Sequence, residues 1–261
     1  MEWTPPGTGH NRPGRTGRDG SPPVWTVGLT KTHGKGPAAV RALDGVTASF
    51  ERGVFTAVMG PSGSGKSTFL HCLAGLESPD SGEVVVAGRD ITRMSEKELT
   101  RLRSEAVGFV FQSFHLIPTL TVEENITIGQ RLSGRPVDSS WRDELVAFLG
   151  LAERVRHRPS ELSGGQQQRV AVARALIHRP VVVFADEPTG NLDSRSGQRV
   201  LDALRHAVDR NGQSVVMVTH DPVAAARADR VLFLRDGRLA GELVSPDASA
   251  VLERLKRLEQ S

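Results

Sequence analysis

The sequence contains little cysteine and few aromatic residues. Its 261 residues include one cysteine and no tyrosine, and aromatic side chains make up 5% of the chain. The single cysteine, Cys72, cannot form a disulfide within the chain, and no group of Cys and His residues has the spacing of zinc ligands. Disulfide scaffolds and structural zinc sites are therefore excluded, and we expect Cys72 to be a small buried apolar residue.

Long hydrophobic runs are also missing. The longest, residues 181–185 and 215–218, are far shorter than the roughly 20 residues that a membrane span needs. Residues 1–23 contain ten Gly and Pro residues and no apolar stretch of the kind that a secretory signal carries. We therefore expect residues 1–23 to be a disordered tail, on a chain that does not cross a bilayer and lies in the cytoplasm.

Charge of one sign is not in large excess. The 33 Lys and Arg residues nearly balance the 30 Asp and Glu residues, for a formal net charge of +3. Basic residues are scattered beside acidic ones and aromatic residues are few, so no direct nucleic-acid partner is expected. With 38% hydrophobic residues, the composition is that of a globular protein, and the length fits one large α/β domain or two small ones.

The first part of the chain alternates short β-rich runs with turns. We expect a small, partly antiparallel start from residues 24–30, 46–50, 54–59 and 83–86. The character of residues 95–150 is helical, with capping boxes that begin at Ser95 and Thr121. This stretch predicts a helical insertion.

The last part of the chain predicts a buried parallel sheet. The apolar runs 181–185 and 215–219 flank an amphipathic stretch at 194–210, which is typical of strands covered by helices on both faces. A hairpin around residues 231–243 and a terminal helix at 250–259 are expected to follow.

A phosphate-binding motif follows the apolar run 54–59. Residues 60–67 read GPSGSGKS, which fits the Walker A pattern. Glycines allow the loop to curl so that its N–H groups face phosphate oxygens, Lys66 brings a cation to the β and γ phosphates, and Ser67 offers a hydroxyl to Mg²⁺. The sequence therefore predicts a nucleoside triphosphate site, whose candidate residues are Gly60, Pro61, Ser62, Gly63, Ser64, Gly65, Lys66, Ser67 and Thr68.

Two adjacent carboxylates end the apolar run 181–185. Because side chains alternate along a strand and Pro188 turns the chain, Asp186 and Glu187 point in different directions and can take different roles. We expect Asp186 to hold Mg²⁺ through water and Glu187 to polarise the attacking water.

A third motif, LSGGQQQR at residues 162–169, gives the chain a resemblance to the ATP-binding cassette family. Other elements of that family appear in order along the chain, and together the motifs cover about residues 24–241. These elements are Gln112 after residues 109–111, residues 191–193 after the two acids, and His220 after the run 215–219. The resemblance implies a P-loop ATPase fold with a mostly parallel sheet flanked by helices, an antiparallel β subdomain and a helical insertion. It places the cassette at residues 24–245, its helical subdomain at about 95–178, and a C-terminal helix at 246–261.

The resemblance also implies how the site works. Two cassettes pair head to tail, so that Ser163, Gly164, Gly165 and Gln166 of one chain act on the ATP of the other. Gln112 joins the Mg²⁺ shell and senses the γ phosphate. His220 contacts that phosphate and positions Glu187. Asp193 communicates across the dimer. Glu187, His220 and Lys66 are the catalytic residues, with Ser67, Gln112 and Asp186 around the metal.

The base platform departs from the family pattern. Cassettes of this kind commonly stack adenine on an aromatic residue after the first strand, and the matching position here is His33. An imidazole still stacks, but it offers a smaller face, so we expect weaker or less selective adenine binding.

Residues 108–125 and 218–222 resemble the subfamily that drives lipoprotein release, macrolide export and antimicrobial-peptide efflux. That resemblance implies a motor subunit on the inner face of the membrane, bound to a separate integral permease. Two other ATPases of the family remain as alternatives, a soluble one that acts on nucleic acid or ribosomes and one that signals in cell division.

Two surfaces have open interpretations. The surface formed by Phe114, Leu116 and Ile117 either contacts the permease or packs inside the helical insertion. The basic amphipathic terminal helix either packs on the cassette, the expected outcome, or lies on anionic lipid.

Overall fold

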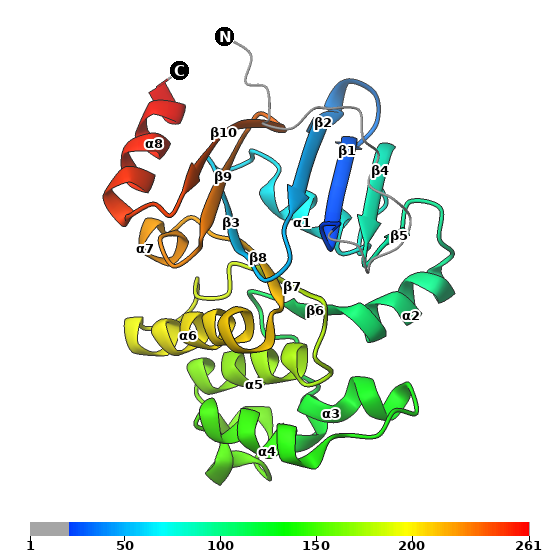
Figure 1. The fold of residues 1–261 in the computed structure, drawn as a ribbon, viewed down its shortest axis with the longest axis vertical. Coiled ribbons are helices and arrows are strands. Elements are labelled where there is room, and N and C mark those ends of the chain that lie inside the picture. The colour runs from blue at the N-terminus through cyan, green and yellow to red at the C-terminus, as the bar shows by residue number, and fades with distance from the viewer. Residues whose placement is uncertain (1–20, 261) are drawn as a thin grey trace.

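The structure, a computed structural model, describes residues 21–260, which form two sheets and their covering helices (Figure 1). Most of the tail predicted at residues 1–23 lies outside the described residues. The smaller sheet is antiparallel, with the order β2-β1-β4-β5. Its strands are β1 (Val24–His33), β2 (Val40–Phe50), β4 (Ser81–Val86) and β5 (Arg89–Asp90).

The larger sheet has the order β10-β9-β3-β8-β7-β6 and is parallel except for β10, which pairs with β9 as the predicted hairpin. Its strands are β3 (Phe55–Met59), β6 (Val107–Val110), β7 (Val182–Asp186), β8 (Ser214–Val218), β9 (Arg230–Arg235) and β10 (Arg238–Val244). In parallel sheets, sites form at the carboxyl ends of such strands. Asp186 and Glu187 lie at such a position, at the carboxyl end of β7.

Both faces of the larger sheet are buried, as the uninterrupted apolar runs predicted. Neighbouring residues of β3 face two different cores, with Ala57 and Met59 in one and Val58 in the other. Because strand side chains alternate, each of these strands contributes to both cores. The cassette fold expected from the resemblance is confirmed.

The helices divide between these two cores. The structure contains α1 (Lys66–Leu73), α2 (Glu96–Ala106), α3 (Val122–Leu132), α4 (Ser139–Phe148), α5 (Gly164–Leu176), α6 (Ser194–Asn211), α7 (Pro222–Ala225) and α8 (Ala248–Gln260). Three short 3-10 turns occur at Gly36–Ala38, Ala152–Arg154 and Pro159–Glu161. Helices α3 to α6 lie in the lower half of Figure 1, whereas α1 lies in the upper half beside the antiparallel sheet.

Two predictions from the strand and helix patterns are wrong. The stretch 95–150 is not helical throughout, because β6 lies within it and pairs in parallel with β7. Four residues, VGFV, are too few to show a strand period, and Gly108 marks a close approach to the Ala175 carbonyl. The run 54–59 belongs to the larger sheet as β3, not to the antiparallel start.

The terminal helix packs on the cassette, as expected. Val251 and Leu258 of α8 are buried in the core that also contains Ala57 and Met59, and Arg254 donates to the Ala240 carbonyl at 2.6 Å. Cys72 is fully buried in α1, which confirms its expected place. None of the helices in residues 21–260 has both the length and the apolar character needed to cross a bilayer.

Candidate active site

The loop at residues 60–65 joins β3 to α1, and two of its glycines are required by packing. A Cβ on Gly60 would collide with the Leu234 carbonyl, and one on Gly65 with the Ala42 carbonyl. Gly63 has open space around it but a φ of 77°, in the left-handed region that glycine adopts without strain. The loop is therefore held closely against β9 and β2 while its tip stays open.

Lys66 begins α1 and is held by this loop. Its ammonium donates to the carbonyls of Gly60 at 2.9 Å and Pro61 at 2.8 Å. Burial lowers the pKa of this amine below its usual value, and the carboxylates of Glu187 and Asp186 partly offset the effect. Its charge therefore lies among the loop atoms that the sequence assigned to phosphate.

Ser67 and Asp186, which are 119 positions apart in sequence, meet at the carboxyl end of β7. The Ser67 hydroxyl donates to Asp186 Oδ1 at 3.1 Å. His71, one turn further along α1, places Nε2 at 3.4 Å from Asp186 Oδ2. Both carboxylate oxygens are thus oriented by side chains of the helix that follows the phosphate loop.

The residues at this point fit Mg²⁺, for which hard oxygen ligands are preferred. Ser67 and Asp186 supply a hydroxyl and a carboxylate, and Mg²⁺ is commonly held by one or two protein oxygens together with substrate phosphates. Residues 21–260 contain no cluster of three or more His, Cys, Asp and Glu side chains that would hold a metal by itself. Only a metal shared with a ligand fits this donor set.

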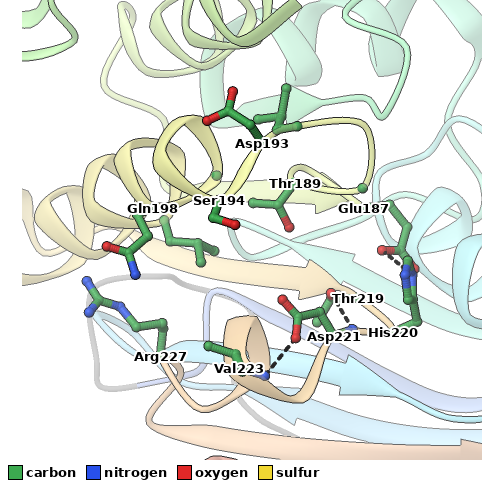
Figure 2. Close-up of a pocket in the computed structure, with 14 residues that line it drawn as sticks. Glu187, Thr189, Asp193, Ser194, Gln198, Thr219, His220, Asp221, Val223 and Arg227 are labelled. Carbon is green, nitrogen blue, oxygen red and sulfur yellow. Dashed lines mark hydrogen bonds and ion pairs between the residues drawn. The ribbon is translucent and has the colours of Figure 1, made fainter.

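Glu187 lies beside His220, with Glu187 Oε2 at 2.9 Å from His220 Nδ1 (Figure 2). Glu187 has a φ of 45°, and its N–H donates to the Val218 carbonyl at 2.9 Å. The two neighbouring acids therefore have different partners, as the sequence predicted.

A cavity of about 410 Å³ opens beside this pair. Asp193, Ser194, Gln198, Thr219, Asp221 and Arg227 are among the residues that line it, and Figure 2 shows Arg227 at the end opposite Glu187. Asp193 caps α6 by accepting from the Ser196 N–H, and these hydrogen bonds hold the pKa of its carboxyl below the ordinary value. Asp193 thus stays ionised at the entrance of α6.

Gln112 follows β6 and is exposed. Its backbone carbonyl accepts a long hydrogen bond of 3.5 Å from Asn191 Nδ2, and its side-chain amide lies close to Gly190. In this conformation the contacts of Gln112 are with the segment that follows Glu187, and none joins it to Ser67 or Asp186 among the residues described.

Ser163, Gly164, Gly165 and Gln166, here called the signature residues, lie at the start of α5 and differ in exposure. Ser163 and Gln166 form a capping box, while Ser163 and Gly164 are exposed. Gly165 is buried, and a Cβ there would collide with Ser196 of α6. Gly165 is therefore required by helix packing within the chain, which the motif alone did not indicate.

His33 ends β1 next to the start of α1. Its Nε2 lies 3.1 Å from the Thr68 hydroxyl, and its Nδ1 lies 3.5 Å from Glu77. About half of the His33 side chain is exposed, at 48%. The ring is thus beside the phosphate loop with room for a ligand on its open side.

Sequence reasoning missed a groove of about 300 Å³ between β6, α3 and α5. The rings of His71, Phe109, Phe111 and His115 form a continuous series with centroids 4.2 to 5.9 Å apart, from Asp186 toward this groove. The only signal in the sequence was the alternation of aromatic residues at 109 and 111. Of the three residues suggested for a partner, Ile117 is exposed, Leu116 packs partly against the core, and Phe114 is half-buried near Gly164.

Comparisons with known proteins identify the family of the chain. Residues 43–190 match the family described as ABC transporter. The chain is 47% identical over 221 residues to an uncharacterized ABC transporter ATP-binding protein of Mycobacterium tuberculosis, covering 84% of this chain and 89% of that relative. It is 43% identical over 227 residues to the macrolide export ATP-binding/permease protein MacB of Chlorobaculum tepidum, covering 86% of this chain. The match spans only 35% of that MacB protein.

The fold is also similar to a solved dimeric structure of the ATP-binding cassette MJ0796 in a post-hydrolysis state, bound to ADP and Pi. The TM-score is 0.79 at 38% identity, and the match covers 85% of this chain and 99% of the other. Because the family model matches residues 43–190 and the Mycobacterium relative is 47% identical over 84% of this chain, the chain belongs to the ABC transporter family as an ATP-binding, ATP-hydrolysing cassette.

Proposed function

We propose that the chain is the motor subunit of an ABC exporter. It works as a homodimer, and closure of that dimer around ATP and Mg²⁺ drives a separate integral membrane permease. The cassette lies peripherally on the cytoplasmic face of the membrane, which it reaches through that permease. No direct nucleic-acid partner is proposed.

The observation that carries this proposal is the divergence of the two acids at the end of β7. Asp186 is oriented by Ser67 toward the phosphate loop, and Glu187 lies 2.9 Å from His220 Nδ1. A carboxylate beside a metal position and a second one held by an imidazole are what water attack on a γ phosphate requires. One strand end supplies both.

Each residue of the site then has a defined task. Lys66 and the loop formed by residues 60–68, through the backbone N–H groups of its non-proline residues, bind the phosphates, and His33 stacks on the base. Ser67, Asp186 and Gln112 would hold Mg²⁺, which neutralises phosphate charge when it is bound. Glu187 orients and polarises the attacking water, while His220 fixes Glu187 and contacts the γ phosphate.

The exposed start of α5 supports the proposal that two chains form a dimer. Ser163 and Gly164 face solvent in the single chain, and α5 lies in the half of Figure 1 away from α1. A helix start provides N–H groups and a positive dipole end for a phosphate of a second chain. Gln166 shapes this start, and Asp193 lies between it and the cavity at Glu187.

The groove between β6, α3 and α5 supports the proposal that the chain binds a permease. It combines the aromatic surface of Phe109 and Phe111 with apolar residues of α3. Phe111, which lines the groove, directly precedes Gln112 in the sequence. The similarity to the protein named for macrolide export supports export as the direction of transport. The series of rings from His71 to His115 begins beside Asp186 and ends at the groove, which gives the groove a physical route to the site.

Glu187→Gln tests the proposal. The amide keeps the shape but cannot accept a proton from water, so the variant should bind ATP, turn over at least about 100-fold more slowly and elute as a dimer with ATP and Mg²⁺. ATPase assays and size-exclusion chromatography measure both effects. Lys66→Ala is the control, and it should neither bind ATP tightly nor dimerise.

The same variant identifies the partner. Glu187→Gln protein with ATP and Mg²⁺, captured from detergent-solubilised host membranes, should retain an integral permease. Recovery only from the soluble fraction with ribosomes or nucleic acid would contradict the transport role. A variant that stays monomeric with ATP would contradict the dimer.

A further inference from the structure

Gln168 is a buried side chain on α5 that touches two distant segments. Its side chain is 1% exposed, and its Nε2 donates to the Pro188 carbonyl at 2.8 Å and to the Phe111 carbonyl at 3.2 Å. Its Oε1 has no hydrogen-bond partner among residues 21–260. Two backbone carbonyls therefore set the orientation of this amide.

Both carbonyls adjoin residues of the active site. Pro188 follows Glu187, and Phe111 precedes Gln112. Glu187 has the left-handed φ of 45°, which a non-glycine residue keeps only when surrounding contacts hold it. The Val218 carbonyl holds its N–H, the Gly190 N–H binds its carbonyl, and Gln168 fixes the next peptide unit.

The segments on either side of this amide also touch each other. Asn191 donates to the Gln112 carbonyl at 3.5 Å, and Gly190 lies close to the Gln112 side chain. Those contacts are weak or exposed, whereas the bond from Gln168 to Pro188 is buried. A buried bond of this kind transmits displacement because neither partner can turn to water instead.

We infer that Gln168 is a positioning residue that holds Glu187 in its hydrolytic geometry and couples it to the segment that carries Gln112. The inference rests on the proposed role of Glu187. A displacement of α5 or of residues 111–112 moves the Gln168 amide and, through Pro188, the glutamate. Helix α5, which begins at the signature residues, thus contacts the segment that carries Glu187 of the same chain.

Gln168→Met tests this role, because methionine fills similar space and donates nothing to either carbonyl. We expect kcat to fall about tenfold or more while the KM for ATP stays within about twofold, since the phosphate loop is untouched. Gln167→Met is the matched control. The Gln167 amide donates to the Leu162 carbonyl near its own helix start, and this variant should keep the wild-type kcat.

Hydrogen exchange provides a readout that does not depend on turnover. In nucleotide-free protein, Gln168→Met should speed exchange in both 108–116 and 186–193, with exchange in β3 and β8 unchanged. If this variant fails to fold, Gln168→Asn, which draws the amide back by one methylene, should show the same pattern. Faster exchange in one segment alone, or in neither, would overturn the coupling.

The kinetic result separates the two proposals. A wild-type kcat in Gln168→Met, together with an inactive Glu187→Gln, would overturn the positioning role and leave the proposed function intact. Normal turnover in Glu187→Gln would overturn the proposed function itself.

Discussion

Glu187 shows what the sequence could and could not reveal about single residues. Its identity as an acid at the end of an apolar strand is visible in the order of residues, and so is the neighbouring Asp186. Its left-handed backbone and the contacts with His220 and Gln168 are not, because those partners are brought in by other elements. Motif spacing predicts the chemistry of a residue, whereas tertiary contacts determine its geometry.

His33 carries the prediction at this scale. His33→Ala should raise the Kd for ATP roughly fivefold, because base stacking on an aromatic side chain is worth at least about 1 kcal/mol. Fluorescence titration with a labelled nucleotide measures the change. His33→Phe restores a ring but not the contact with Thr68, so it should return the affinity to the wild-type value or better.

An unchanged affinity in His33→Ala would show that His33 is not the base platform. Weak binding in both variants would assign the effect to the contact with Thr68 instead.

At the scale of elements, the long buried strands and the capped helices were predictable, and β6 was not. The capping boxes at Ser95 and Thr121 are present, and α8 packs on the cassette through Val251 and Leu258. Strand β6 is too short for its period to appear, and its place in the sheet depends on pairing with residues 182–185. Sequence patterns identify elements that are long or capped, but not the order of strands in a sheet.

The start of α5 gives a prediction that separates packing from function. Gly165→Ala places a methyl group against Ser196 and should lower the free energy of unfolding by about 1–3 kcal/mol. Gly164→Ala meets only the ring of Phe114 at an ordinary 3.7 Å, so its stability should match the wild type. Its ATPase rate should still fall, because the new methyl group lies on the proposed dimer surface.

Urea denaturation and ATPase assays of the two variants measure both effects. Equal stability of Gly165→Ala and wild type would contradict the packing role, and a fully active Gly164→Ala would contradict contact at that surface.

At the scale of the whole molecule, the shifted pKa values of the carboxyls and histidines among the described residues all have one sign. Hydrogen bonds hold the pKa of several carboxyls below their ordinary values, including Asp44 with Arg238, Glu98 with Ser95 and Glu124 with Thr121. Burial lowers the pKa of His178, which also contacts the Val107 carbonyl at 3.1 Å. All of these groups bind fewer protons in the folded chain than in the unfolded chain over part of the acidic range.

The free energy of unfolding should therefore decrease as pH falls. The loss begins below the ordinary His value of about 6.5 and continues below about 4.5, where unfolded carboxylates take up protons. Urea denaturation between pH 7 and pH 4 measures it. His178→Gln should reduce the loss of stability between about pH 6.5 and 5.5 without altering the loss of stability below about pH 4.5.

Stability that stayed constant or rose on acidification would contradict this assignment. The sequence predicts the capping boxes at Ser95 and Thr121, but it does not give the burial of His178 or the pairing of Asp44 with Arg238, which arise from folding.

The place of Cys72 has a practical consequence for thiol chemistry. Burial, followed by the charge of Glu77, raises the pKa of Cys72 to about 12, so this thiol is protonated and shielded at neutral pH. Because it is the single cysteine of the chain, a second one introduced at an exposed position reacts alone with maleimide reagents. Glu259 lines a cavity together with Pro61 and Ser62, so a dye attached at position 259 would sit beside the phosphate loop. Its emission would report nucleotide arrival and departure without any change to Cys72.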